Sequence, residues 1–236
     1  MAFGDKKTED TGITDHAATV TATCTGYSPA ATDLMVGTYF TGAANGAADT
    51  TGFASAVSVF LSATATDDGH IFWKVGTDTE LVCSDDSGSM EEQVLVAAIF
   101  EGPFKTAPID LTDTGVKETS DPFTTGTAVG NTAQASELMI AIGVYRHGTN
   151  NSQVTFTQTG DVGGTVSSLT TTEGLGSYKH VVFGFQVLTG VGTVGLTLPN
   201  SNNNTGRIGF ATFMEDAGGG GGGSTHHIHL PLLGVG

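Results

Sequence analysis

Apolar residues fall into short runs along the chain, separated by clusters of glycine and small polar residues. The longest run, residues 94–100, reads Val-Leu-Val-Ala-Ala-Ile-Phe and is followed by Gly102-Pro103. A run of this length, rich in Val and Ile and bounded by turn residues, predicts a strand that is buried on both faces. We expect the rest of the fold to be organised around this strand.

Shorter strand-like runs, of which residues 19–24 alternate with period two, predict further strands on either side of it. These are residues 19–24, 33–40, 56–61, 70–75 and 80–83 before the central run, and 136–140, 179–183 and 207–213 after it. Strands at such short spacing, with turn signals between them, indicate a β-sandwich or barrel. Residues 105–135 are rich in Thr and Asp and poor in large apolar residues, so they are expected to form a long crossover.

Three segments of the second half resemble segments of the first. Residues 136–140 echo 32–36, residues 179–183 echo 69–73, and residues 207–213 echo 93–100, at offsets of 104, about 110 and about 113. Such regularity indicates two similar halves, which would form the two facing sheets of one sandwich. The residues predicted to share its single core are Val94, Val96, Ile99, Phe100, Ile208, Phe210 and Phe213.

The chain divides into three parts by composition. Residues 1–17 are polar and are expected to be an arm, either mobile or ordered by a neighbouring subunit. Residues 18–216 are expected to form the sandwich domain. Residues 217–236 are expected to be a tail, in which six glycines act as a flexible tether. The tether is Gly218, Gly219, Gly220, Gly221, Gly222 and Gly223.

An apolar peptide follows the tether and is too short to have a core of its own. We expect it to occupy a groove on a partner as an edge strand or extended arm, because Pro231 cannot donate a ladder hydrogen bond. Its predicted partner-binding residues are Ile228, Leu230, Pro231, Leu232, Leu233 and Val235.

Charge narrows the range of partners. The chain has 8 Lys and Arg against 24 Asp and Glu, a formal net charge of −16. An acidic field of this size repels phosphate backbones and anionic lipid, so neither nucleic-acid binding nor membrane insertion is expected. The start of the chain has no apolar segment of the kind found in signal peptides, and export by that route is not expected. Cys24 and Cys83 are expected to be small buried side chains rather than a disulfide.

The residues that could take part in catalysis or metal binding also have a purely structural interpretation. His16, His70, His147 and His180 have no recognisable nucleophile motif near them and are interpreted as surface or core residues. The acidic pairs Asp67-Asp68 and Asp85-Asp86 could hold Ca²⁺ or flank a hydrolytic site, but we favour solvated hairpin tips.

The tail carries the better candidates for a transition metal. His227 and His229 would project to one side of an extended strand, and a trimer would bring six imidazoles to its axis. The competing interpretation is a tail that a partner simply binds, with no metal.

Several packing positions resemble a known group. They are an acidic residue followed by Leu-Met-Val or Leu-Met-Ile, the buried strand ending in Phe100-Glu101-Gly102 with Pro108 beyond, and a closing strand at 208–213. Together they resemble the jelly-roll domains of tailed-phage virion proteins, of the decoration, spike or tail-fibre type. The resemblance implies an all-β, antiparallel jelly-roll-like sandwich with a structural or adhesive role, and no catalytic signature comes with it.

The expected function is therefore that of a non-enzymatic phage structural protein, made in the host cytoplasm and displayed on the virion. It would be a homo-oligomer, with a trimer favoured, held to other virion proteins by its terminal arms. One alternative is a glycan-binding adhesin that uses Trp73, Tyr39 or Tyr145 as stacking platforms. Another is a glycosidase, which would need two carboxylates about 5 to 9.5 Å apart in one groove.

A screen of the purified protein against glycosides, esters and peptides tests the non-enzymatic interpretation. We expect background rates, because no recognisable catalytic motif is present. Reproducible turnover that is lost in Asp85→Asn or Asp86→Asn would identify an enzyme instead.

Overall fold

The structure is a computed structural model that describes residues 3–14, 17–42, 46–60, 67–85, 92–115, 122–125, 130–146, 155–162, 165–175, 179–199 and 205–217. These residues are arranged as antiparallel β-sheets, as predicted. None of the described segments is a helix with the length and apolar character needed to cross a bilayer.

The first half of the chain forms two sheets. Its strands are β1 (Lys6–Thr14), β2 (Thr19–Thr23), β3 (Leu34–Thr41), β4 (Gly46–Ala48), β5 (Ala54–Phe60), β6 (Asp68–Val75), β7 (Glu80–Asp85) and β8 (Gln93–Phe100). One sheet has five strands in the order β1-β8-β3-β6-β5, and the other has three in the order β2-β7-β4. We call these the first inner sheet and the first outer sheet.

The second half repeats this plan. Its strands are β9 (Phe104–Asp113), β10 (Phe123–Thr124), β11 (Glu137–Arg146), β12 (Thr157–Gln158), β13 (Ser167–Leu175), β14 (Lys179–Leu188), β15 (Leu196–Leu198) and β16 (Gly206–Glu215). The second inner sheet has the order β9-β16-β11-β14-β13, and the second outer sheet has the order β10-β15-β12. Each strand of the first half thus has a counterpart at the same place in the second, which confirms the prediction of two similar halves.

Strand register defines the residue equivalences. Leu34 pairs with Phe100 across β3 and β8, and Leu138 pairs with Phe213 across β11 and β16, which matches the predicted offsets of 104 and 113. The same leucines pair with Val75 in β6 and Val187 in β14, an offset of 112. The predicted offset of about 110 was therefore wrong by two residues. A shift of two residues keeps every side chain on the same face of the sheet, so the apolar pattern could not reveal this error.

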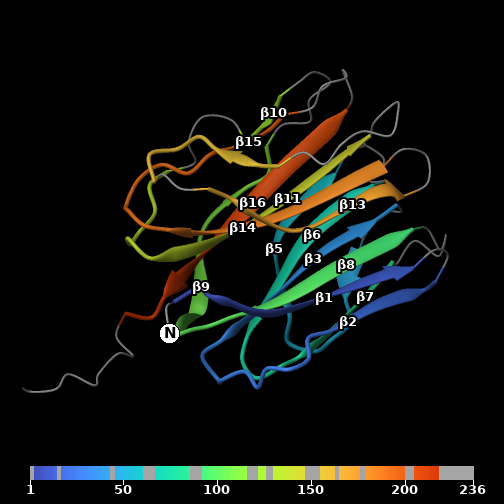
Figure 1. The fold of residues 1–236 in the computed structure, drawn as a ribbon, viewed down its shortest axis with the longest axis horizontal. Coiled ribbons are helices and arrows are strands. Elements are labelled where there is room, and N and C mark those ends of the chain that lie inside the picture. Colours follow the sequence, from blue (N-terminus) through green and yellow to red (C-terminus); the bar gives the residue numbers. More distant parts are fainter. Residues whose placement is uncertain are drawn as a thin grey trace, which may run out of the picture.

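The two inner sheets pack face to face, and each outer sheet covers the far side of its own inner sheet (Figure 1). Three hydrophobic cores lie between the resulting four layers. In the central core, β5 faces β16 and β6 faces β11. The prediction of one core is therefore wrong. Residues 19–24 and 80–83 were predicted as strands, but nothing in their pattern showed that they form a separate outer sheet.

The central run from the sequence is strand β8, and it is buried along its whole length. Val94, Val96 and Phe100 point into the central core, whereas Ile99 points into the first outer core. In β16, Phe213 points into the central core, whereas Ile208 and Phe210 point into the second outer core. These alternating side chains confirm a strand that is covered on both faces.

Two polar segments that were not predicted as strands are edge strands. Residues 6–14 of the expected N-terminal arm form β1, which pairs with β8 of the same chain rather than with a neighbour. Residues 104–113 of the expected crossover form β9, the equivalent strand, which pairs with β16. An edge strand pairs on one side only and tolerates polar residues and Pro108, so neither segment shows an apolar run. The short strands β4, β10, β12 and β15, and edge strand β13, also went unpredicted.

Replacement of Phe100 or Phe213 with Ala tests the central core. Both rings are fully buried there at equivalent positions, so each change should lower the free energy of unfolding by roughly 3 to 5 kcal/mol. Ile13, 56% exposed on β1, supplies the control, and Ile13→Ala should change stability by no more than about 0.5 kcal/mol. Chemical denaturation measures all three. A loss at only one of the two phenylalanines would argue against equivalent packing.

Candidate functional site

Several sequence-predicted site residues lie outside the described residues. These are the tether Gly218 to Gly223, the partner-binding residues from Ile228 to Val235, the metal candidates His227 and His229, and Asp86, His16 and His147. Within the described part of the chain, no group of three or more His, Cys, Asp or Glu side chains is placed to hold a metal ion.

The acidic residues at 67 and 68 are not at a solvated tip. Both side chains are fully buried, and Asp67 has a positive φ of 64°, which is uncommon for a residue other than glycine. The favoured interpretation of this pair was therefore wrong. Asp85 is half-buried at the end of β7.

His70 is a buried core residue. Its Nδ1 lies 2.9 Å from Ser58 Oγ, and its ring packs in a cluster with those of Tyr39 and Phe72, with centroids 6.1 and 5.5 Å away. Burial lowers the pKa of His70 to about 4, so the imidazole is neutral at pH 7 and a weak base. The Ser58–His70 pair therefore has poor properties for nucleophilic catalysis.

The aromatic residues expected as glycan platforms are packed inside the molecule. Tyr39 and Tyr145 are buried in the first and second outer cores, and Trp73 packs on the central core with its ring 6.1 Å from Phe213. Cys24 and Cys83 are buried free thiols in the first outer core, as expected. Burial raises the pKa of the Cys24 thiol to about 11, so neither geometry nor charge favours a reactive thiolate.

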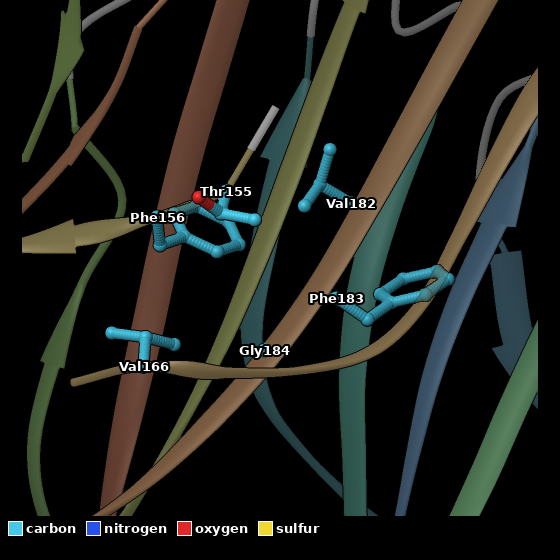
Figure 2. Close-up of a pocket in the computed structure, with 6 residues that line it drawn as sticks. All are labelled: Thr155, Phe156, Val166, Val182, Phe183 and Gly184. Carbon is cyan, nitrogen blue, oxygen red and sulfur yellow. The ribbon is translucent and has the colours of Figure 1, made fainter. Parts of the chain in front are cut away.

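A groove lies on the flank of the second half, between residues at β12 and the start of β13. It has a volume of about 340 Å³ and is lined by Thr155, Phe156, Thr157, Gln158, Thr165 and Val166. A tight crevice with no room for a water molecule adjoins it beside Val182, Phe183 and Gly184 (Figure 2). The groove is at the open edge of the outer sandwich, since β12 and β13 are both edge strands.

Beside the groove, the two halves carry different side chains at equivalent positions. On the first inner sheet, Tyr39 pairs with His70, and Phe72 pairs with Gly37. On the second, the corresponding pairs are Gly143 with Val182, and Gly184 with Ala141. Three large rings are thus replaced by two glycines and a valine.

Phe156 and Val166 fill part of the space left by the missing rings. A Cβ on Gly184 would lie 2.7 Å from Val166 Cγ1 and 3.0 Å from Phe156 Cδ2, so these two side chains rest directly on the glycine backbone. Phe156 and Val166 then form the floor of the groove, and the polar residues form its rim. No sequence pattern pointed to it, because the signal is a pair of small residues where the other half has large ones.

One polar atom of the groove is unsatisfied. Nε2 of Gln158 is buried and has no hydrogen-bond partner among the described residues. A buried donor without an acceptor costs about 1 to 3 kcal/mol, and because protein atoms cover this nitrogen, a molecule in the groove does not reach it. Thr155, Thr157 and Thr165 are exposed on the rim, and each offers a hydroxyl.

A second site of interest is a pair of equivalent carboxylates at the ends of β3 and β11. Asp33 is buried and accepts hydrogen bonds of 2.8 Å from Tyr27 Oη and from the backbone N–H groups of Ala30 and Gly102. These three donors match a charged carboxylate. Asp33 therefore acts as a structural clamp that ties the end of β8 to β3.

Glu137 occupies the equivalent position in the second half, but with fewer donors. Its Oε1 accepts the Gln134 N–H at 3.2 Å, and its Oε2 is buried without a hydrogen bond of normal geometry in the described ranges, although the Thr212 side chain favours the charged form. Burial, reinforced by the nearby Asp110 carboxylate, raises the pKa of Glu137 to about 7. Burial thus makes Glu137 easier to protonate than an ordinary glutamate.

Comparisons with protein-family models, with curated proteins and with solved structures found no match to this chain.

The Glu137→Gln variant tests the buried acid. The pKa of Glu137 is higher in the folded than in the unfolded protein. The contribution of Glu137 to the free energy of unfolding is therefore fully present below pH 4.5, and it is lost as the pH rises through 7. The variant, which is neutral at every pH, should be more stable than the unchanged protein at pH 8 by roughly 1 to 3 kcal/mol and similar to it at pH 4. Thermal unfolding at both pH values measures this.

Asp33→Ala is the matched comparison in the first half. It removes the acceptor of three hydrogen bonds and should therefore destabilise the protein at both pH values. If Glu137→Gln destabilised the protein at pH 8 to the same extent, Glu137 would be a charged clamp like Asp33.

Proposed function

We propose that this protein is a non-enzymatic structural protein of a phage-like virion, displayed on the particle and held to neighbouring subunits by its terminal segments. The observation that carries the proposal is that both described chain ends lie together at one end of the molecule, beside the link between the halves (Figure 1). Two terminal segments that leave from one place can fasten the molecule to one surface and leave its other end displayed.

The contacts that hold the ends together are specific. Near the N-terminus, the Gly4 N–H donates to the Glu101 carbonyl at 2.9 Å, and the Phe3 ring lies 4.7 Å from that of Phe104. Near the C-terminus, the Asp216 N–H donates to the Pro103 carbonyl at 2.8 Å. Lys7 adds an ion pair with Glu101. Both ends are therefore anchored on the short link 101–104.

The order of the strands in the two sheets of each half also supports the proposal. The first and last strands of a half lie side by side in the inner sheet, and the second and seventh lie side by side in the outer sheet. This nested order resembles that of a jelly roll, an architecture found in viral capsid, lectin and cupin domains. The resemblance noted in the sequence points to the same class of protein.

The oligomeric state and the location belong to the same proposal. We propose a homo-oligomer, with a trimer favoured, in which the tail of one subunit binds a neighbour through Ile228, Leu230, Leu232, Leu233 and Val235. The formal charge of −16 would keep such a protein soluble and away from packaged nucleic acid. A second candidate, a glycan-binding module, is favoured by one observation, the neutral groove on the flank of the second half.

Deletion of residues 218–236 tests the role of the tail. The described fold ends with β16 at Glu215 and the Asp216 contact, so the shortened protein should keep the same thermal unfolding midpoint. Assembly, measured by analytical ultracentrifugation and by incorporation into particles, should be weakened. A lower unfolding midpoint would mean that the tail packs on the domain, and unchanged assembly would mean that it does not bind a neighbour.

Cryo-electron microscopy of intact particles tests the location directly. Density for the four-layer domain on a capsid lattice would identify a decoration protein, and density at a tail tip would identify a receptor-binding one. The proposal fails if a strain that makes the protein yields particles that lack it.

A further inference from the structure

We propose that Asp110 and Glu137 form a carboxyl pair that acts as a pH-sensitive latch on the turn before β11. While the pair keeps one proton, it holds this turn, residues 132–136, against β9 and the end of β16. When the proton is lost to solvent, both carboxyl groups are charged and the turn is released.

Hydrogen bonds to one turn bring the two carboxyl groups together. Asp110 Oδ2 on β9 accepts the Ala133 N–H at 2.7 Å, and Glu137 Oε1 accepts the next amide, that of Gln134, at 3.2 Å. Consecutive amide nitrogens are less than about 4 Å apart, so carboxyl groups bound to both are neighbours. Asp110 acts on Glu137 through its charge and as a hydrogen-bond acceptor, and both effects favour the protonated form of the fully buried Glu137.

Strand register shows which residue of the first half corresponds to Asp110. Lys6 in β1 and Ile109 in β9 pair with phenylalanines at equivalent positions of β8 and β16. Both edge strands then have an irregularity within the next three residues. Lys7 therefore corresponds to Asp110, and the charge at this position has opposite signs in the two halves.

This reversal of charge gives the two buried acids different neighbours. In the first half, Lys7 forms an ion pair with Glu101 and also feels the charge of Asp33, the equivalent of Glu137. A nearby cation and three hydrogen-bond donors match a permanently charged Asp33. In the second half, a carboxylate replaces the cation, so two acids compete for one proton.

The other groups around Glu137 do not replace the missing cation. The Thr212 hydroxyl on β16 favours the charged form of Glu137, but burial has the larger effect. Lys105 on β9 has its Nζ 3.3 Å from Met214 Sδ. Glu215, the last residue of β16, is a further acid, and β14 places an apolar leucine opposite Glu137.

The latched turn ties two strand ends together. Gln134 Nε2 donates to the carbonyls of Ser136 and Glu215 at 2.8 and 3.0 Å, so the turn that binds β9 through Asp110 also holds the end of β16. Repulsion between two charged carboxylates is relieved if one of them leaves its amide. The closed turn is therefore stabilised below the ordinary pKa of glutamate, and this stabilisation is lost as the pH rises through the raised pKa of Glu137.

Hydrogen exchange of the full-length protein, followed by mass spectrometry at pH 5 and pH 8.5, tests the latch. After correction for the intrinsic effect of pH on exchange, protection of residues 108–113 and 131–136 should fall by about tenfold or more at pH 8.5. The equivalent segments of the first half, residues 5–10 and 27–32, should keep their protection, because Asp33 is charged at both pH values.

Three variants connect the opening to the carboxyl pair. Glu137→Gln should abolish the loss of protection at pH 8.5. Asp110→Asn removes one charge but keeps an acceptor for the Ala133 N–H, so it should limit the loss to about threefold or less. Asp10→Asn is the matched control, because Asp10 also accepts one backbone N–H, that of Thr23 at 2.7 Å, but lies in the first half. It should keep the full response.

A carbon-13 NMR titration of the glutamate carboxyl groups separates a proton switch from a purely structural role. The Glu137 signal, assigned by its absence in Glu137→Gln, should titrate at higher pH than that of an ordinary glutamate, and at lower pH in Asp110→Asn than in the unchanged protein. The proposal is overturned if protection is equal at both pH values, if the first-half segments open equally, or if Asp110→Asn leaves the Glu137 titration unchanged. The last two measurements do not depend on Glu137→Gln being stable.

Discussion

The packing of one inner sheet against the other is the interaction on which the rest of the molecule depends. Phe100 and Phe213 lie at equivalent positions in this central core, which takes side chains from both halves. Strands such as β8 are apolar on both faces, so burying one face still leaves the other in need of cover. Each outer sheet supplies that cover. The four layers therefore follow from two sheets that cannot be exposed to water on either side.

The duplicated plan separates what the two halves must share from what each may change. A substitution in the central core affects packing on both inner sheets, whereas each outer core touches only its own half. Divergence is visible in the outer cores, where Tyr39 in one half corresponds to Gly143 in the other. It is visible at the strand ends too, where Asp33 is fully hydrogen-bonded and Glu137 is not.

The sequence predicted well those features that produce long apolar runs. Strand β8 and the equivalence of Leu34 with Leu138 follow directly from apolar pattern and repeat. Edge strands β1 and β9 were missed because a strand with one neighbour and a solvated side can be polar. Strands β2 and β7 of the first outer sheet were predicted, but the other outer strands were missed because strands of two or three residues, such as β12 and β15, carry no periodicity. The groove could not be predicted, because it depends on which residues face each other across those strands.

The flanks of the two halves are packed differently at equivalent positions. In the first half, β4 lies over the aromatic residues so closely that a Cβ on Gly46 would be 2.5 Å from Tyr39 Cε1 and 3.0 Å from His70 Nε2. On that flank, the aromatic rings of Tyr39 and His70 pack directly against the backbone of β4. In the second half, Gly143 and Gly184 remove the rings, and Phe156 restores only part of the lost volume. The remaining space faces solvent at a sheet edge, where it can be modified without disturbing the central core.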